Sequence, residues 1–185
     1  MGGRVWLIRH GATVAPAGVA VGGASDPPLS EVGRAQAVEL AERLRDRPLS
    51  AVWSSDSMRA HDTAAMIAES HRLLVRTSAA LREIDFGSWE GRFLSDLWRE
   101  DPEAASAWES DLRHTPRAFG ENVAQLELRV AQVWSEIKPS VGGREAVVVA
   151  HRGSLAALRA VIRRCSFATA FASPMELGSA EAIDL

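Results

Sequence analysis

The chain has 185 residues, of which 46% are hydrophobic and 24% charged, and its formal net charge at pH 7 is -3. This is the composition of an ordinary soluble globular protein, so residues 1–185 are predicted to form a single domain. A slightly acidic chain offers no basic field for nucleic acid or for an anionic membrane surface, and neither is expected as a partner.

Two further features bear on where the protein works. Cys165 is the only cysteine, so an internal disulfide is excluded. No apolar run approaches the ~20 residues of a membrane span, and the run near the start is too short for a signal peptide. These features predict a cytoplasmic location, and they leave the oligomeric state open.

In the first half of the chain, short apolar runs alternate with amphipathic stretches. Residues 5–8 (VWLI), 51–53 and 73–75 predict strands, the first of them buried on both faces. Ser30 is expected to cap a helix that ends before Pro48. Its predicted inward residues are Val32, Ala35, Val38 and Leu44. The helix after the second strand is predicted to bury Met58, Ala65, Met66 and Ile67.

The second half continues the alternation after an irregular segment at 81–91. Residues 93–112 predict one or two short helices, with Pro102 in a first turn. A long helix follows Gly120 and is expected to end at Pro139. Its predicted inward residues are Val123, Leu126, Val130, Val133, Trp134 and Ile137. Residues 146–150 (AVVVA) predict a strand, followed by a helix and a last edge strand at 180–185.

The inward residues predicted for that last helix are Leu155, Leu158 and Ile162. Strands that alternate with helices indicate an α/β fold. We expect a three-layer sandwich, with a mostly parallel central sheet and helices on both faces.

The ends of the predicted strands carry the chemistry. The strand 5–8 leads into Arg9-His10-Gly11, and the strand 146–150 leads into His151-Arg152-Gly153. Arg59 follows a third strand, just inside the next helix. Ligands bind beyond the carboxyl ends of parallel strands, so neighbouring strands would bring two imidazoles and several guanidinium groups together. Such a cluster predicts a phosphate site.

These residue types suit the transfer of a phosphoryl group. The planar fork of arginine matches phosphate oxygens, and a neutral imidazole is a competent nucleophile near neutral pH. The leaving oxygen needs a proton, for which Glu83 and Asp85 in the irregular segment are the candidate acids. A lone histidine or arginine in a loop is more often a solvated polar residue. Placement after two buried strands favours the functional interpretation here.

Other polar and aromatic residues lack that placement. The histidines left as surface or helix residues are His61, His71 and His114. No histidine pair or carboxylate cluster has the spacing of metal ligands, so neither a metal nor a cofactor is expected. The tryptophans predicted to form core or pocket wall are Trp89, Trp98 and Trp108.

Five motifs together resemble the histidine phosphatase (phosphoglycerate mutase-like) superfamily: LIRHGAT, SDPPLSEVGRAQA, SSDSMRAHDTA, LREIDFGSWEG and VVVAHRGSL. The resemblance implies that His10 is the phosphorylated nucleophile and that Arg9 and Arg59 clamp phosphate oxygens. It implies that His151 donates a hydrogen bond to the transferring group. Glu83 would protonate the leaving oxygen and then activate water. The residues expected to bind substrate are Arg9, Arg59, His151, Arg152 and Thr13.

Within that superfamily, residues 96–130 resemble α-ribazole phosphatases. The expected reaction is therefore hydrolysis of α-ribazole 5′-phosphate, a small phosphomonoester, in cobalamin biosynthesis. A broad sugar-phosphate phosphatase or a mutase is the alternative enzyme, and product analysis separates the two.

Three departures from the family pattern matter. Ala12 stands where a glutamate is common, Pro16 stands near a common phosphate-binding asparagine, and Arg152 stands where glycine or glutamine is common. A weakly active protein that only binds a phosphate ligand is therefore a third alternative. Our hypothesis is that Arg152 restores part of the charge missing from the first loop.

Overall fold

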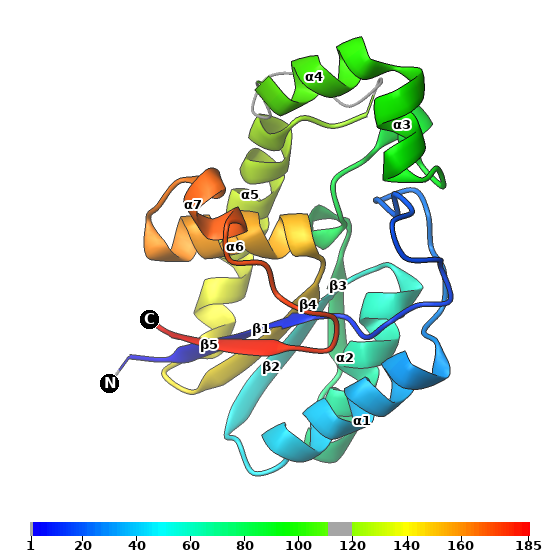
Figure 1. The fold of residues 1–185 in the computed structure, drawn as a ribbon. Coiled ribbons are helices and arrows are strands. Elements are labelled where there is room, and N and C mark those ends of the chain that lie inside the picture. Colours follow the sequence, from blue (N-terminus) through cyan, green and yellow to red (C-terminus); the bar gives the residue numbers. More distant parts are fainter. Residues whose placement is uncertain (1, 111–119) are drawn as a thin grey trace.

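The computed structural model describes residues 2–110 and 120–185 (Figure 1). Within these residues one sheet has the strand order β3-β2-β4-β1-β5. The strands are β1 Arg4–Arg9, β2 Leu49–Ser55, β3 Val75–Ser78, β4 Glu145–Ala150 and β5 Ala180–Asp184. All neighbours pair in parallel except β5, which lies antiparallel to β1 at the edge. The predicted mostly parallel sheet and its last edge strand are confirmed.

Helices cover both faces of this sheet, as the prediction of three layers requires (Figure 1). One face carries α1 (Glu31–Leu44) and α2 (Met58–His71), and the other carries α5 (Val123–Val141), α6 (Arg152–Arg163) and α7 (Phe167–Phe171). Alternate residues of β4 enter the two cores, with Val148 in one and Val149 in the other. A strand buried on both faces reads as a continuous apolar run, which explains the AVVVA pattern.

Two short helices, α3 (Leu94–Glu100) and α4 (Pro102–Ser110), lie away from the layers, beyond the carboxyl ends of the parallel strands (Figure 1). Pro102 begins α4, as predicted. The segment before α3 contains two single 3-10 turns, at Ala79–Leu81 and Gly87–Trp89. Each helix in the described part of the chain is too short or too polar to cross a bilayer.

The inward face predicted for α1 is wrong except at Leu44, which is buried. The exposed residues of that prediction are Val32, Ala35 and Val38. The buried residues lie on a different helix face: Gly33, Ala37, Leu40 and Leu44. A Cβ at Gly33 would overlap the backbone of Ala12, so the helix packs directly on the loop after β1. This close approach, rather than the position of the valines, sets the orientation of α1. Ser30 caps the helix as expected.

The inward face predicted for α2 is also mostly wrong. Ile67 is buried, but Met58 is 48% exposed, and the other two predicted residues, Ala65 and Met66, are only half-buried. The buried face carries two polar residues, Arg59 and Thr63. The rest of this face is made of alanines and Ile67, so the larger apolar side chains of the helix do not mark it.

The other differences are smaller. The face predicted for α5 is confirmed at every residue. The helix, however, continues past Pro139 to Val141, since Pro139 lies on the exposed face, where water can bond the carbonyl that loses its partner. Strand β3 begins at Val75, two residues later than predicted. Ile162 of α6 is only partly buried against the core.

Candidate active site

The two motif histidines meet because their strands are parallel neighbours. Arg9 at the end of β1 pairs in register with Ala150 at the end of β4, so His10 and His151 leave the sheet side by side. Their ring centroids are 5.0 Å apart, with the ring planes at 61°. Both side chains are buried. The structure thus brings together two histidines that are 141 residues apart in the sequence.

The hydrogen bonding of His10 fixes which ring nitrogen is free. Its Nδ1 lies 2.7 Å from the carbonyl oxygen of Gly11. A carbonyl only accepts, so Nδ1 carries the proton and Nε2 keeps its lone pair. The pKa of His10 is lowered to about 3, mainly by burial and also by the nearby Arg59 and Arg9 charges, while the Gly11 hydrogen bond opposes this shift. His10 is therefore a neutral imidazole with a bare Nε2.

His151 is buried beside His10. The ring is 1% exposed, and neither nitrogen has a hydrogen-bond partner among the described residues. Burial, followed by the proximity of His10 and Arg59, lowers the pKa of His151 well below its usual value. A buried polar ring without partners is costly unless a ligand supplies the missing bond. The neutral ring has one N–H to donate to such a ligand.

Arg59 and Arg9 supply positive charge beside the histidines. Arg59 is 1% exposed, and it donates to the carbonyls of Ser25 at 2.7 Å and Gly22 at 3.2 Å. Arg9 donates to the carbonyl of Met175 at 2.8 Å. These bonds orient the guanidinium groups, while the buried Nε of each arginine has no partner in the described part of the chain.

The pKa of each of these arginines is lowered, first of all by burial. The Glu83 carboxylate opposes this effect on the pKa of both Arg9 and Arg59, which places its charge near both of them. The buried Arg59 and the half-buried Arg9, together with two neutral imidazoles, form a site for an anion with several oxygens.

Glu83 lies against the start of α6. The backbone N–H of Gly153 lies 3.0 Å from its Oε1 and 3.1 Å from its Oε2, and the N–H of Ile84 donates to Oε1 at 2.9 Å. A Cβ on Gly153 would overlap Oε1, so only glycine leaves room for the carboxylate there. The candidate acid therefore lies next to the His151 motif, because Gly153 is part of that motif.

The alternative acid, Asp85, is placed differently. It is exposed, and its carboxylate accepts the N–H of Gly87 at 2.8 Å. Both Asp85 and Glu83 border a polar hollow, but of the two only Glu83 also lines the cavity that includes Gly153. The geometry favours Glu83 as the carboxyl group that serves the histidines.

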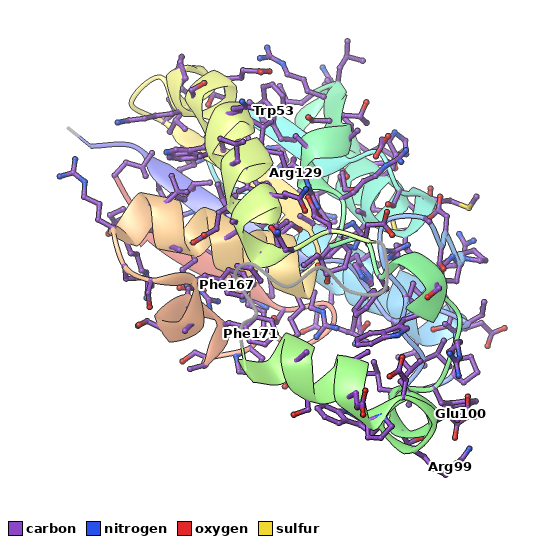
Figure 2. All side chains as sticks on the ribbon, turned by 90° about the horizontal axis from the view of Figure 1, so that it is seen from above. Trp53, Arg99, Glu100, Arg129, Phe167 and Phe171 are labelled. Carbon is purple, nitrogen blue, oxygen red and sulfur yellow. The ribbon has the colours of Figure 1, made fainter. Side chains whose placement is uncertain are left out.

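A cavity of about 260 Å³ opens beside Glu83. Its described lining is mainly apolar and aromatic: Ile84, Phe86, Trp89, Leu94, Trp98, Val123, Leu126, Phe167 and Phe171. Figure 2 shows Phe167 and Phe171 next to each other on α7. Trp89 and Trp98 form pocket wall, as predicted, whereas the side chain of Trp108 lies outside the described residues.

Arg152 lies at this cavity. Its guanidinium carbon is 4.4 Å from the centroid of the Phe171 ring, a cation–π arrangement. Its charge also contributes to the lowered pKa of Arg9, after burial. The side chain is exposed. Arg152 is thus stacked at the edge of the apolar cavity, within electrostatic range of Arg9.

The remaining predicted residues lie farther from this arrangement. Thr13 forms a bridge with Leu29, and its hydroxyl accepts the N–H of Ala15 at 3.4 Å. His61 is exposed on α2, and His71 ends that helix. His114 lies outside the described residues. In the described ranges, no group of three histidine, cysteine or acidic side chains could hold a metal ion.

Glu90 is a site residue that the sequence analysis did not single out. Its carboxylate accepts the N–H of Gly22 at 3.0 Å and the hydroxyl of Ser25. The carbonyls of the same two residues hold Arg59. Glu90 therefore joins the segment that carries Glu83 to the loop that orients Arg59. The sequence feature that could have indicated Glu90 is its place as a further carboxylate within the LREIDFGSWEG motif.

Three comparisons relate this arrangement to known proteins. The histidine phosphatase superfamily (branch 1) profile matches residues 5–185. The glucosyl-3-phosphoglycerate phosphatase of Mycobacterium tuberculosis is 36% identical over 167 residues, 86% of this chain and 74% of the relative. The adenosylcobalamin/α-ribazole phosphatase of Salmonella typhimurium is 32% identical over 182 residues, 98% of this chain and 90% of the relative. The crystal structure of the α-ribazole phosphatase from Shigella flexneri superposes with a TM-score of 0.89 at 32% identity, covering 98% of this chain and 90% of that one.

Proposed function

The chain belongs to the histidine phosphatase superfamily and is a phosphoric monoester hydrolase, and from this premise we propose that it works through a phosphohistidine on His10. The observation that carries the proposal is the bare Nε2 of a neutral His10 beside the buried Arg59 and the half-buried Arg9. In-line attack by Nε2 on phosphorus forms the N–P bond as the bond to the ester oxygen breaks. Arg9, Arg59 and His151 neutralise and hold the phosphoryl oxygens.

Glu83 completes both halves of the reaction in this proposal. In the first step the carboxylic acid gives its proton to the departing ester oxygen, which leaves as an alcohol. In the second step the Glu83 carboxylate takes a proton from water, whose oxygen attacks the phosphorus. The N–P bond breaks, inorganic phosphate is released, and His10 returns as the neutral imidazole. No metal is required by these steps, and metal independence remains a prediction.

The proposed substrate is α-ribazole 5′-phosphate, which carries an aromatic base on its ribose. The cavity beside Glu83 supports this choice, because its described walls are mainly apolar and aromatic. Flat aromatic groups gain binding free energy by stacking on such walls. We expect the phosphate to lie at His10 and the base to enter the cavity. That residues 1–185 form one domain, and that the enzyme works in the cytoplasm, also remain predictions.

Arg152 supports a second candidate. The substrate named for the mycobacterial relative is glucosyl-3-phosphoglycerate, a glycoside whose glycerate part carries a carboxylate and whose glucose part carries several hydroxyls. Arg152 is a cation at the edge of the cavity and could pair with that carboxylate. Sugar hydroxyls gain less binding free energy from aromatic walls than an aromatic base does, so α-ribazole 5′-phosphate is the favoured substrate.

A substrate panel tests this choice. We expect kcat/KM to be highest for α-ribazole 5′-phosphate, lower for glucosyl-3-phosphoglycerate and lowest for glycerol phosphate. Each assay measures released inorganic phosphate with and without EDTA. An isomeric phosphate ester among the products would indicate a mutase instead. Equal kcat/KM for the aromatic and the sugar substrate would contradict the proposed preference.

Trp98→Ala tests the cavity itself. Trp98 lines the cavity, and losing one aromatic stacking partner costs ~1–3 kcal/mol per base, so kcat/KM for α-ribazole 5′-phosphate should fall by about 5- to 150-fold. Glycerol phosphate should be hydrolysed as before. Phe93→Ala is the matched control, because Phe93 is similarly exposed and does not line the cavity. An equal loss on both substrates would show that the cavity does not hold the leaving group.

Gly153→Ala separates the effect of the Glu83 position on activity from any effect on the stability of the protein. The new Cβ would displace the end of the flexible Glu83 side chain, whereas alanine favours a helix over glycine by up to ~1 kcal/mol. We expect an unchanged or slightly raised Tm with a loss of about 10- to 100-fold in kcat/KM on alkyl phosphates, since small misplacements of a reacting group are that costly. Thermal unfolding and steady-state kinetics measure the two effects. Full activity with a normal Tm would show that Glu83 does not need this position.

A further inference from the structure

Arg129 on α5 contacts the segment that carries Glu83. The side chain is 22% exposed and reaches from the helix into the irregular stretch between β3 and α3. Figure 2 shows Arg129 on α5 near the sheet, far from Arg99 and Glu100 at the outer end of α3. None of the five superfamily motifs includes Arg129, which lies near the end of the stretch 96–130 that resembles α-ribazole phosphatases.

The guanidinium group binds three nearby backbone carbonyls. Nη1 donates to the carbonyl of Ala80 at 2.8 Å and to that of Arg82 at 2.9 Å, and Nη2 donates to the carbonyl of Glu83 at 3.1 Å. Carbonyls in an irregular segment have no helix or sheet partners and need others. The last of the three belongs to the proposed acid itself.

The guanidinium is in turn fixed by Glu121. Its Nε donates to Oε1 at 2.6 Å and its Nη2 to Oε2 at 2.7 Å, a bidentate pair. The backbone N–H of Glu121 also donates to the carbonyl of Asp85 at 2.9 Å. The segment is therefore held on both sides of Glu83, by Arg129 up to Glu83 and by Glu121 beyond it.

We propose that Arg129 is a positioning residue that fixes the backbone of the acid segment and thereby directs the Glu83 carboxyl group toward the reacting phosphate. The inference rests on the acid role of Glu83 proposed above. Arginine has five N–H donors in a fixed plane, and the contacts of Arg129 use all five. Lysine has three donors on one atom and cannot reproduce this pattern.

The positive charge of Arg129 has an effect that is separate from the hydrogen bonds made by its planar guanidinium group. After burial, His10 and Arg59, it contributes to the lowered pKa of His151. A lysine at 129 would keep that charge but lose the planar fork. Arg129→Lys therefore distinguishes positioning through hydrogen bonds from an effect of charge alone.

The experiment measures kcat/KM of Arg129→Lys and Arg129→Met across phosphate esters with good and poor leaving groups. This ratio reports the steps up to departure of the leaving group. A misplaced acid hinders poor leaving groups most, so we expect a loss of about 10- to 100-fold for alkyl phosphates and a much smaller loss for activated aryl phosphates. Lysine should not restore activity. The same variant in a Glu83→Gln background should add little further loss.

Arg47→Lys is the matched control. Arg47 also forms a bidentate pair, with Glu145 at the opposite end of β4 from His151, so its loss affects stability without changing the dependence on leaving group. If Arg129→Met does not fold, Arg129→Lys and Glu121→Gln carry the test. A uniform loss over all esters, or full activity of Arg129→Lys, overturns the inference alone. A Glu83→Gln variant without leaving-group dependence overturns the acid role as well, and with it the role of Arg129.

Discussion

Replacing His10 by alanine is expected to abolish turnover of every phosphate ester. Nε2 of His10 is the bare nitrogen at the centre of the site. The neighbouring His151 does not replace it, because in the proposed mechanism His151 holds phosphoryl oxygens. Enzymes that lose a covalent nucleophile lose on the order of 10⁶-fold in kcat. Steady-state assays with an activated aryl phosphate measure this loss with the greatest sensitivity, because such a substrate depends least on the acid.

A trapping experiment identifies the residue that carries the phosphoryl group. Wild-type enzyme mixed with labelled substrate and quenched in alkali should retain an acid-labile label on His10, and His10→Ala should retain none. His61→Ala is the control, since His61 is exposed on α2 and its recorded ion pair is with Asp62 at 3.9 Å. Label on any other residue, or substantial turnover by His10→Ala, would remove the proposed mechanism.

His10→Ala should also change how the free energy of unfolding depends on pH. The pKa of His10 is lowered to about 3 in the folded protein, mainly by burial, whereas an exposed histidine has a pKa of ~6.5. The unfolded chain therefore binds a proton at this position between those pH values, and the folded state loses stability as the pH falls through that window. His10→Ala removes this contribution, which unfolding measured at several pH values detects.

Glu83→Gln is expected to slow the reaction according to the leaving group. Glutamine keeps an oxygen to accept the N–H of Gly153 but has no proton to give. We expect kcat/KM for alkyl phosphates to fall by about 10²- to 10⁴-fold, the usual contribution of general acid catalysis. The aryl oxide of an activated aryl phosphate leaves without a proton, so kcat/KM for these substrates should fall far less. A plot of kcat/KM against leaving-group pKa measures the difference.

Asp85→Asn is the control for this assignment. Asp85 is exposed and bonded to Gly87, so its neutral analogue should keep the leaving-group dependence of the wild type. Equal losses on aryl and alkyl phosphates in Glu83→Gln would show that Glu83 is not the acid. A selective loss in Asp85→Asn instead would transfer the role to Asp85.

The strongest predictions from the sequence were those set by periodicity. The β1 and β4 runs are apolar on both faces because helices cover both sides of the sheet, and such runs are visible in a linear chain. The faces of α1 and α2 were predicted poorly. A glycine contact at Gly33 and a buried arginine at Arg59 decide those faces, and neither contributes to an apolar pattern.

The sequence by itself determined the α/β architecture and the placement of His10 and His151, since residues that directly follow buried parallel strands must emerge at one edge of the sheet. Only the tertiary structure decided which candidate carboxyl group lies against the His151 motif, which aromatic residues line the cavity, and which residues hold Arg59 and Glu83 in place. Those contacts join irregular segments that have no periodicity, and their geometry depends on hydrogen bonds between residues far apart in the chain. A linear pattern records none of these bonds, because each forms only after the layers have packed.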